Sequence, residues 1–220
     1  MSHSRFGSAL ILALTSTFLL SCSSKPVKSP EEVLAQKFKF FDAIQKGDTK
    51  LVKAFIENGV DANTKDDAAD TALVLAASRG ETEMARMLID AGADVNARGN
   101  GGRTALIAAS FDESNQGFAK TDTVRVLIKA RANVNAKDDA GLTALIRAAQ
   151  TNVHSTATLT DNSGKVQVMK MDSNGEIVRM LIEAKADVNT RSNDGRTALN
   201  VASNKGDTEI VRMLKEAGAN

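Results

Sequence analysis

The chain has 220 residues, of which 42% are hydrophobic and 25% charged, a mixture typical of one or two globular domains. Aromatic residues make up only 4%, which excludes a bulky aromatic core and leaves the packing to small and aliphatic side chains. The formal net charge is +1 and Lys and Arg form no cluster, which argues against nucleic acid as a partner.

Residues 1–21 are predicted to be a signal peptide. A short polar start with one positive charge, Met1 to Arg5, precedes an uncharged and mostly apolar run of 15 residues, Phe6 to Leu20. This run is shorter than the roughly 20 residues that span a bilayer, but it fits the apolar region of a secretory signal. The alternative is an N-terminal core helix, which is disfavoured because the polar residues of the run leave it no amphipathic face.

Cys22, the only cysteine of the chain, stands where the apolar run ends. The string Leu19-Leu20-Ser21-Cys22 resembles the lipobox of bacterial lipoproteins, in which the signal is cut before a cysteine that then carries lipid. The resemblance implies a lipid anchor on Cys22 at the periplasmic side of a Gram-negative membrane. Ser23, rather than Asp, after the cysteine implies sorting to the outer membrane. Lipidation would leave the mature chain without a free thiol, as suits an oxidising compartment.

Residues 22–29 are polar and predict a flexible tether. The string Ser29-Pro30-Glu31-Glu32 then predicts the start of a helix, with a Ser cap, Pro at the first helical position and Glu three residues after the cap. The globular domain is therefore expected over residues 30–220.

From residue 30 onward the sequence repeats itself. The string Thr71-Ala72-Leu73-Val74 returns 33 residues later (104 − 71 = 33) at Thr104, and similar strings begin at Thr143 and Thr197. Copies of a second string, Leu-Ile followed by a variant of AGADVNA, lie between them. The same offsets lead back from Thr71 to a first unit around Phe38. A period of 33 with a Thr-x-Leu start is the signature of ankyrin repeats, and the chain resembles that family over residues 30–220.

The resemblance implies an all-α solenoid of five helix-turn-helix units, at about residues 30–70, 71–103, 104–142, 143–196 and 197–220. Small residues, Ala76 and Ala77, lie where the first helix of a unit approaches its neighbour. Met84, Met87 and Leu88 supply the apolar stripe of a second helix. Segments rich in Asp and Asn between the units predict projecting turns, the tips. The end units are atypical, as expected for a solenoid.

The residue that follows the second helix is glycine in three units, Gly59, Gly92 and Gly218. A left-handed residue is expected to end each of these helices. Arg131 and Lys185 hold the same place in units three and four. Both are therefore expected to adopt a left-handed backbone that glycine would adopt without strain.

The sequence departs from the family pattern in two ways. The usual Thr-Pro-Leu-His has Ala in place of Pro in four units and no His, so the hydrogen bonding of that motif is not carried over. The spacing also grows, to 39 residues from Thr104 to Thr143 and 54 from Thr143 to Thr197, which is 6 and 21 above the period. Both inserts are expected between first and second helices, near Phe111–Thr121 and Thr151–Asp172.

The longer insert predicts a β-hairpin, with a disordered loop as the alternative. Residues 156–160 and 165–169 alternate in polarity on either side of residues 161–164, which have turn chemistry. In this register one apolar face would contain Ala157, Leu159, Val166 and Val168. A lone hairpin cannot bury such a face, so it is expected to pack on Phe111 or Phe118 of the shorter insert, or on a client.

No catalytic, metal or cofactor site is predicted, and the chain is expected not to be an enzyme. The sequence has no Cys/His ligand cluster, no Gly-rich phosphate loop and no nucleophile elbow. His154, in the longer insert, is the only histidine after the signal, and it has no second His or Cys as a partner. The pair Asp138-Asp139 is interpreted as part of a tip rather than an acid/base couple.

The ankyrin resemblance implies protein binding through the concave side. In that family the variable contact positions are tip residues and the end of the first helix. Carried over to this sequence, these positions are Asp67, Ala68, Asp70, Ser78 and Arg79 in unit two, Asn100, Arg103, Phe111 and Asp112 in unit three, Asp139, Leu142, Gln150 and Thr151 in unit four, and Asn193, Arg196, Asn204 and Lys205 in unit five.

Two hypotheses follow. In the first, the chain is a monomeric, lipid-anchored periplasmic scaffold that binds a protein client through its concave face and its inserts. In the second, the inserts house a small-ligand or enzymatic role. A pocket with converging polar groups near His154 would favour the second hypothesis, and an exposed groove the first.

Overall fold

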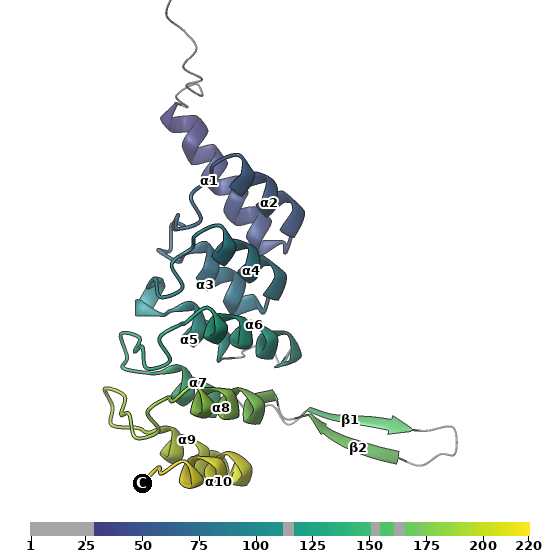
Figure 1. Ribbon diagram of the computed structural model, residues 1–220, viewed down its shortest axis with the longest axis vertical. Coiled ribbons are helices and arrows are strands. Elements are labelled where there is room, and N and C mark those ends of the chain that lie inside the picture. The colour runs from purple at the N-terminus through teal and green to yellow at the C-terminus, as the bar shows by residue number, and fades with distance from the viewer. Residues whose placement is uncertain (1–28, 112–116, 151–154, 161–165, 172) are drawn as a thin grey trace, which may run out of the picture.

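The computed structural model describes residues 29–111, 117–150, 155–160, 166–171 and 173–220. These residues form ten α-helices in five antiparallel pairs, stacked one on the next along the long axis of the molecule (Figure 1). The expected all-α solenoid is confirmed. The predicted signal peptide, Cys22 and the tether as far as residue 28 lie outside the described residues.

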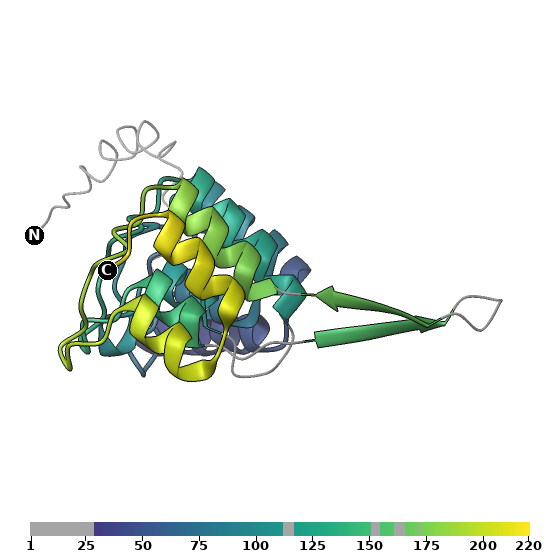
Figure 2. The same cartoon turned by 90° about the horizontal axis from the view of Figure 1, so that it is seen from below.

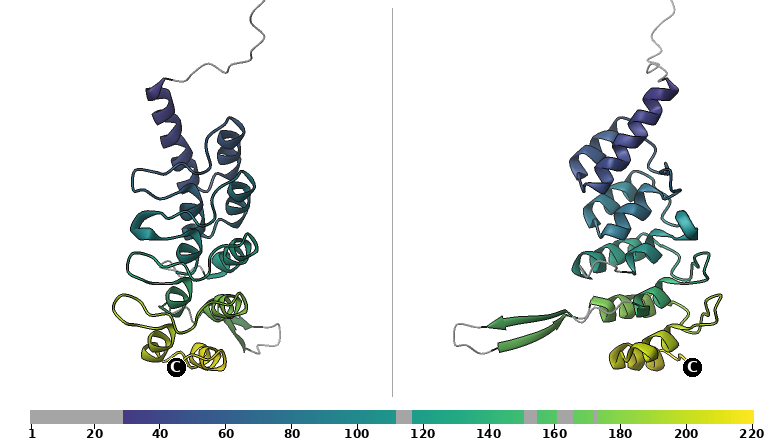
Figure 3. Two further views of the ribbon diagram at one scale, coloured as in Figure 1. Left: turned by 60° about the vertical axis from the view of Figure 1, so that its left-hand side comes forward. Right: turned by 180° about the vertical axis from the view of Figure 1, so that it is seen from behind.

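Each helix pair is one unit of the repeat. The pairs are α1 (Pro30–Gln45) with α2 (Thr49–Glu57), α3 (Ala72–Arg79) with α4 (Thr82–Asp90), α5 (Ala105–Ala109) with α6 (Gly117–Lys129), α7 (Ala144–Gln150) with α8 (Ser173–Glu183), and α9 (Ala198–Lys205) with α10 (Thr208–Glu216). The first helices stack in one row and the second helices in another (Figure 3). The tips project from the side of the stack, and one of them contains the short helix η1 (Asn100–Gly102). We call the side formed by the tips and the first helices the inner face.

A threonine cap starts the first helix of four units. The Oγ1 of Thr71 accepts the backbone N–H of Val74 at 3.2 Å, which satisfies a donor that the helix itself cannot pair. The threonines that open α5, α7 and α9 accept the N–H three residues on in the same way. The first unit lacks this threonine, and Ser29 with Glu32 forms the expected capping box at α1 instead.

The core lies between the two rows of helices and runs through all five units. Ala76 and Ala77 are fully buried on α3, where their small side chains let α5 pack closely, as predicted. Met84 and Leu88 are also fully buried, while Met87 is only partly covered. The largest fully buried side chains are Phe40, Ile44, Leu73, Met84, Leu88, Leu106, Ile107, Leu127, Leu145, Ile146, Leu181 and Ile210.

An asparagine ties each tip to the next. The Oδ1 of Asn63 accepts the backbone N–H of Asp94, one unit further on, at 2.7 Å. The equivalent bonds join Asn96 to Asn133 at 2.7 Å, Asn135 to Asp187 at 2.8 Å and Asn189 to Asn220 at 3.1 Å. The Asn of the repeated string AGADVNA therefore sets the spacing between consecutive units.

The backbone at the end of the second helices is left-handed, as expected. Arg131 has a φ of 63° and Lys185 a φ of 67°, close to the 88° of Gly92 at the same place in unit two. A side chain in this region costs about 1–3 kcal/mol, because its Cβ crowds the backbone. The ends of α6 and α8 therefore hold strain that the ends of α2, α4 and α10, where glycine stands at this place, do not.

The two ends of the stack differ. In unit five Lys215 of α10 is exposed. At the first unit α1 has 16 residues against 8 in α3, and its first half extends past the stack (Figure 1). Phe38, at the middle of α1, is 57% exposed.

The shorter insert is partly helical, which corrects the expected boundaries. Helix α6 begins at Gly117 and has 13 residues against 9 in α4, so the last part of the insert extends the second helix. Asp112 lies outside the described residues. The segment between first and second helix in unit three is therefore shorter than the sequence predicted.

The longer insert contains β1 (Ser155–Thr160) and β2 (Val166–Met171), paired antiparallel. Thr160 pairs with Val166, so residues 161–165 connect the strands, one residue more than the predicted turn. A shift of one residue moves residues to the opposite face. Ala157 and Leu159 therefore pair with Met169 and Gln167. The predicted face that they share with Val166 and Val168 is wrong.

The strand pair projects away from the helices, on the side opposite the tips (Figure 2). The expected packing of the strands on Phe111 is therefore wrong: the ring of Phe111 lies against Arg147 instead. The side chain of Phe118 lies outside the described part of the structure, as do Thr151 and His154.

Candidate functional site

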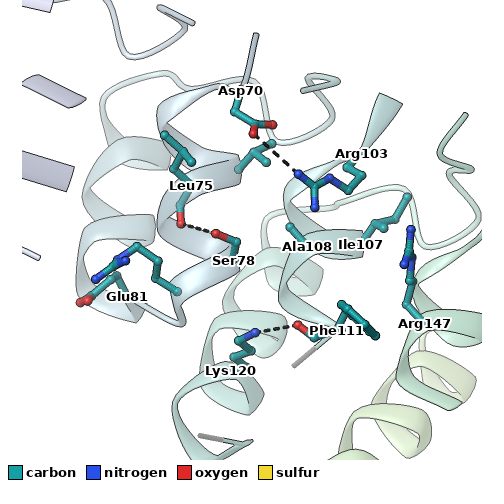
Figure 4. A pocket seen from close by; sticks show the side chains of 12 residues that line it. Asp70, Leu75, Ser78, Glu81, Arg103, Ile107, Ala108, Phe111, Lys120 and Arg147 are labelled. Atoms are coloured by element: carbon teal, nitrogen blue, oxygen red, sulfur yellow. Dashed lines mark hydrogen bonds and ion pairs between the residues drawn. The ribbon is translucent and has the colours of Figure 1, made fainter. Parts of the chain in front are cut away.

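A hollow of about 490 Å³ opens on the inner face of units two to four (Figure 4). Its apolar residues come from two first helices and from the residue at the start of the shorter insert: Val74, Leu75, Ile107, Ala108 and Phe111. Charged side chains surround this apolar part: Asp70, Arg79, Glu81, Arg103, Lys120 and Arg147. The hollow therefore combines apolar area with charged groups, as binding sites for peptides and small ligands do.

Arg147 of α7 forms one wall of the hollow. Its guanidinium carbon lies 5.2 Å from the centre of the Phe111 ring, within the range of a cation–π contact. Its Nη2 donates to Oδ2 of the buried Asp138 at 2.8 Å. Two contacts on different sides thus hold the guanidinium in place beside the apolar part.

Lys120 joins the two ends of the shorter insert. It is buried on α6, and its Nζ donates to the carbonyl oxygen of Phe111 at 2.6 Å (Figure 4). The contact links the extended start of α6 to the end of α5. The insert of unit three therefore helps to shape the hollow.

Asp70 and Arg103 form the edge of the hollow next to the tips. The Oδ1 of Asp70 accepts the backbone N–H of Asn100 at 2.9 Å, and its Oδ2 lies 3.7 Å from Nη2 of Arg103. Asp70 is buried, so its main effect is to fix the tip of unit three. The side chain of Arg103 is 39% exposed and is the accessible member of the pair.

Five of the contact positions predicted from the sequence line this one hollow: Asp70, Ser78, Arg79, Arg103 and Phe111. They meet because the end of a first helix and the tip of the next unit border the same space. The sequence reasoning missed Arg147, Lys120 and Glu81. A signal for Arg147 existed: it is a charged residue four places after Thr143, where the other units have Leu75, Ala108 and Val201. No comparable signal marks Lys120.

Other predicted positions lie on the tips, outside the hollow. Asp67 pairs with Lys37 of α1 at 2.9 Å, and Asp139 pairs with Arg98 at 2.8 Å. The amide of Asn193 donates to the carbonyl oxygen of Asp139 at 2.9 Å. These contacts join neighbouring units, so the residues support the stack as well as offering surface. Ala68 and Asn100 are exposed on their tips.

The remaining predicted positions are scattered. Leu142 is buried in the core and is not offered to a partner. The Nζ of Lys205 donates to the carbonyl oxygen of Gln150, which joins the ends of α7 and α9. Asn204 is exposed at the end of α9.

The tip of unit five holds a close ion pair. Arg196 lies 2.5 Å from Oδ2 of Asp194, and the hydroxyl of Ser192 donates to Oδ1 of Asp194. The hydrogen bond from Arg196, followed by that from Ser192, lowers the pKa of Asp194 to about 2. The same bond raises the pKa of Arg196. Both groups are therefore charged at neutral pH.

A second hollow, of about 830 Å³, lies on the other side of the stack between α2 and α4. Lys50, Lys53 and Arg86 are among its lining residues, and none of the predicted contact positions is. We call it the competing hollow, because a client that bound it would contact the opposite side of the stack from the inner face.

Among the residues that the structure describes, no three His, Cys, Asp or Glu side chains gather as a group that could hold a metal ion. Within the same ranges, every helix is too short or too polar to cross a bilayer.

Comparison with known protein families gives one match. The family model for ankyrin repeats, in three copies, matches residues 40–138 and 157–220 of the chain. These ranges contain every residue of the inner-face hollow named above except Arg147, which falls in the gap between them. Comparison with curated proteins gives no match.

Proposed function

Because the chain belongs to the ankyrin-repeat family, whose repeats generally mediate protein–protein interaction, we propose that it binds a protein client on its inner face. The observation that carries the proposal is the hollow of units two to four, where five contact positions meet. A solenoid sets its units in the same orientation, so equivalent positions of successive units form one extended surface.

The proposed role is binding without catalysis. The hydroxyl of Ser78 donates to the carbonyl oxygen of Leu75 in its own helix, at 2.8 Å, and neither His nor Cys is among the residues that line the hollow. An activated nucleophile needs a neighbouring base. The small-ligand alternative placed in the inserts is also less well supported, because only two of the residues that line the hollow, Phe111 and Lys120, come from an insert.

We place this scaffold on the periplasmic side of a bacterial outer membrane, with lipid on Cys22. The support is the apolar run that ends in the only cysteine of the chain. In this proposal the longer insert is a second contact for the client, because β1 and β2 project from the stack and leave their outer edges open to pairing (Figure 2).

The test starts from the full-length chain, tagged at its C-terminus and isolated from envelope extracts with its captured client. Binding of the purified client is then measured with Arg79→Ala and Arg103→Ala on the inner face. Lys53→Ala and Arg86→Ala, in the competing hollow, are the matched controls. Truncation of a central contact costs more than about 1 kcal/mol, or roughly a factor of five in Kd. A loss confined to the controls would contradict the proposal.

A further inference from the structure

Exposed apolar side chains are concentrated at the N-terminal end of the stack. Among the residues whose burial the structure describes, which leaves out residues 117–119 and both strands, the large apolar side chains that are at least 43% exposed are Val33, Leu34, Phe38 and Leu51, and all four belong to unit one. Three of them lie on the N-terminal part of α1, residues 30–39. We call Val33, Leu34 and Phe38 the α1 patch.

The α1 patch continues a stripe that is buried further along the same helix. Val33 and Leu34 precede Phe40 and Phe41 by seven residues, which is two helical turns, so they lie on the same face. Phe40 is fully buried and Phe41 is 5% exposed. The N-terminal part of α1 extends past α2 and the neighbouring unit (Figures 1 and 3), and its apolar side chains stay exposed. One charged residue, Lys37, lies on the same face, where its Nζ is paired with Asp67 of a tip at 2.9 Å.

The opposite side of this part of α1 is charged. Glu32 and Lys39 are exposed and lie seven residues apart, on the far side of the helix from Leu34. A helix with an apolar face and a charged face is the kind that lies in a membrane interface, with the apolar side chains in the boundary between headgroups and acyl chains.

The proposed lipid anchor on Cys22 would bring the N-terminal part of α1 to the bilayer. Cys22 is seven residues before Ser29, the cap of α1, and seven extended residues span at most about 25 Å. Tethering at such a short distance gives the α1 patch a high effective concentration at the lipid surface. A water-soluble partner is not tethered beside unit one, so its local concentration there is not raised in this way.

We propose that the N-terminal part of α1 lies on the bilayer that holds the anchor, with Val33, Leu34 and Phe38 in the interface. The inference rests on the proposed lipid anchor. It gives the stack a fixed orientation: unit one faces the lipid, and the hollow of units two to four stays in water, open to a client. The polar end at Lys215 is the end that points away.

The test uses Phe38→Trp in the full-length lipidated chain, because the sequence contains no other Trp. The protein is reconstituted into phosphatidylethanolamine and phosphatidylglycerol vesicles with and without brominated acyl chains. The Trp emission is expected to shift to the blue and to be quenched by the brominated lipid. Lys215→Trp, exposed on the last unit, is the control and is expected to show neither change. Adding Val33→Ser and Leu34→Ser to Phe38→Trp is expected to abolish the quenching.

The outcomes separate this inference from the anchor itself. If the chain floats with the vesicles but Phe38→Trp is not quenched, the anchor stands and the docking of α1 is overturned. If the chain does not float, the anchor fails and the inference fails with it. A blue shift without quenching by brominated lipid would mean that protein, a client or a second copy, covers the α1 patch, which also overturns the inference.

Discussion

The side chain of Asn135 accepts the backbone N–H of Asp187 at 2.8 Å, although the two residues are 52 positions apart. The same bond joins residues 31 to 37 positions apart elsewhere in the stack. Units three and four are therefore spaced as if the longer insert were absent. The insert can be this large because it leaves the stack opposite the tips (Figure 2).

Replacing residues 156–171 with a short Gly/Ser linker is therefore expected to leave the free energy of unfolding almost unchanged. Loop closure entropy varies only slowly with loop length. Asn135→Ala, which removes one tip bond, is the contrasting variant and is expected to cost about 1 kcal/mol. Urea denaturation of both variants makes the comparison. Binding of the client should weaken in the linker variant alone, and undiminished binding would remove the insert from the interaction surface.

Arg131→Gly is expected to raise the melting temperature, because glycine adopts the observed φ of 63° without strain. A gain of about 1 kcal/mol corresponds to roughly 2–4 °C for a domain of this size. Lys185→Gly should behave in the same way. Gly92→Ala is the reciprocal control and should lower the melting temperature, since no atom lies within 4 Å of the added methyl and only the backbone strain remains. Calorimetry that found Arg131→Gly less stable would contradict this account of the turn.

The repeat period made the fold predictable from the sequence. Thr71 and its equivalents, the paired alanines and the left-handed residues recur at fixed offsets, and each has a local physical role that needs no knowledge of the rest of the chain. The strand register was not predictable in this way. It depends on whether four or five residues connect the two strands. With five, Ala157 and Val168 lie on opposite faces of the strand pair and not on one face.

The candidate site was predictable only where it follows the repeat. Arg79 and Arg103 stand at repeat positions that carry contacts in the family, and the structure brings them to one hollow. Lys120 reaches that hollow only because α6 is extended at its start, which depends on how the shorter insert folds. Leu142 occupies a contact position in the sequence but is buried in the core, where its backbone N–H donates to Oδ1 of Asp138 at 2.8 Å.

The titration of Asp194 tests the ion pair of the last tip. Because its pKa in the folded chain, about 2, lies below the ordinary value of 3.8, the pair contributes stability above pH 3.8 and loses it as the pH falls towards 2. Carboxyl chemical shifts measured by NMR across this range should give a midpoint near 2. In Arg196→Gln the midpoint should return towards 3.8. A wild-type midpoint already at the ordinary value would mean that the pair does not form in solution.

Cys22→Ala tests the proposed anchor. Without the cysteine the signal cannot be cut and lipidated at this site, so the variant is expected to stay uncut or to be released in soluble form. Fractionation of the envelope with antibody detection measures both outcomes. Ser21→Ala, beside the cysteine, is the control and should leave the chain membrane-bound. A processed Cys22→Ala chain that still sediments with membranes would contradict the lipid anchor.

The most direct test of client binding on the inner face is site-specific photo-crosslinking in intact cells. A photoreactive residue replaces either Ser78, in the inner-face hollow, or Arg86, in the competing hollow between α2 and α4. Both variants keep the rest of the chain, so expression and anchoring are matched. The account predicts a discrete protein adduct from position 78 and none from position 86. Adducts from position 86 alone would show that the client binds the opposite side of the stack, and would contradict the central claim.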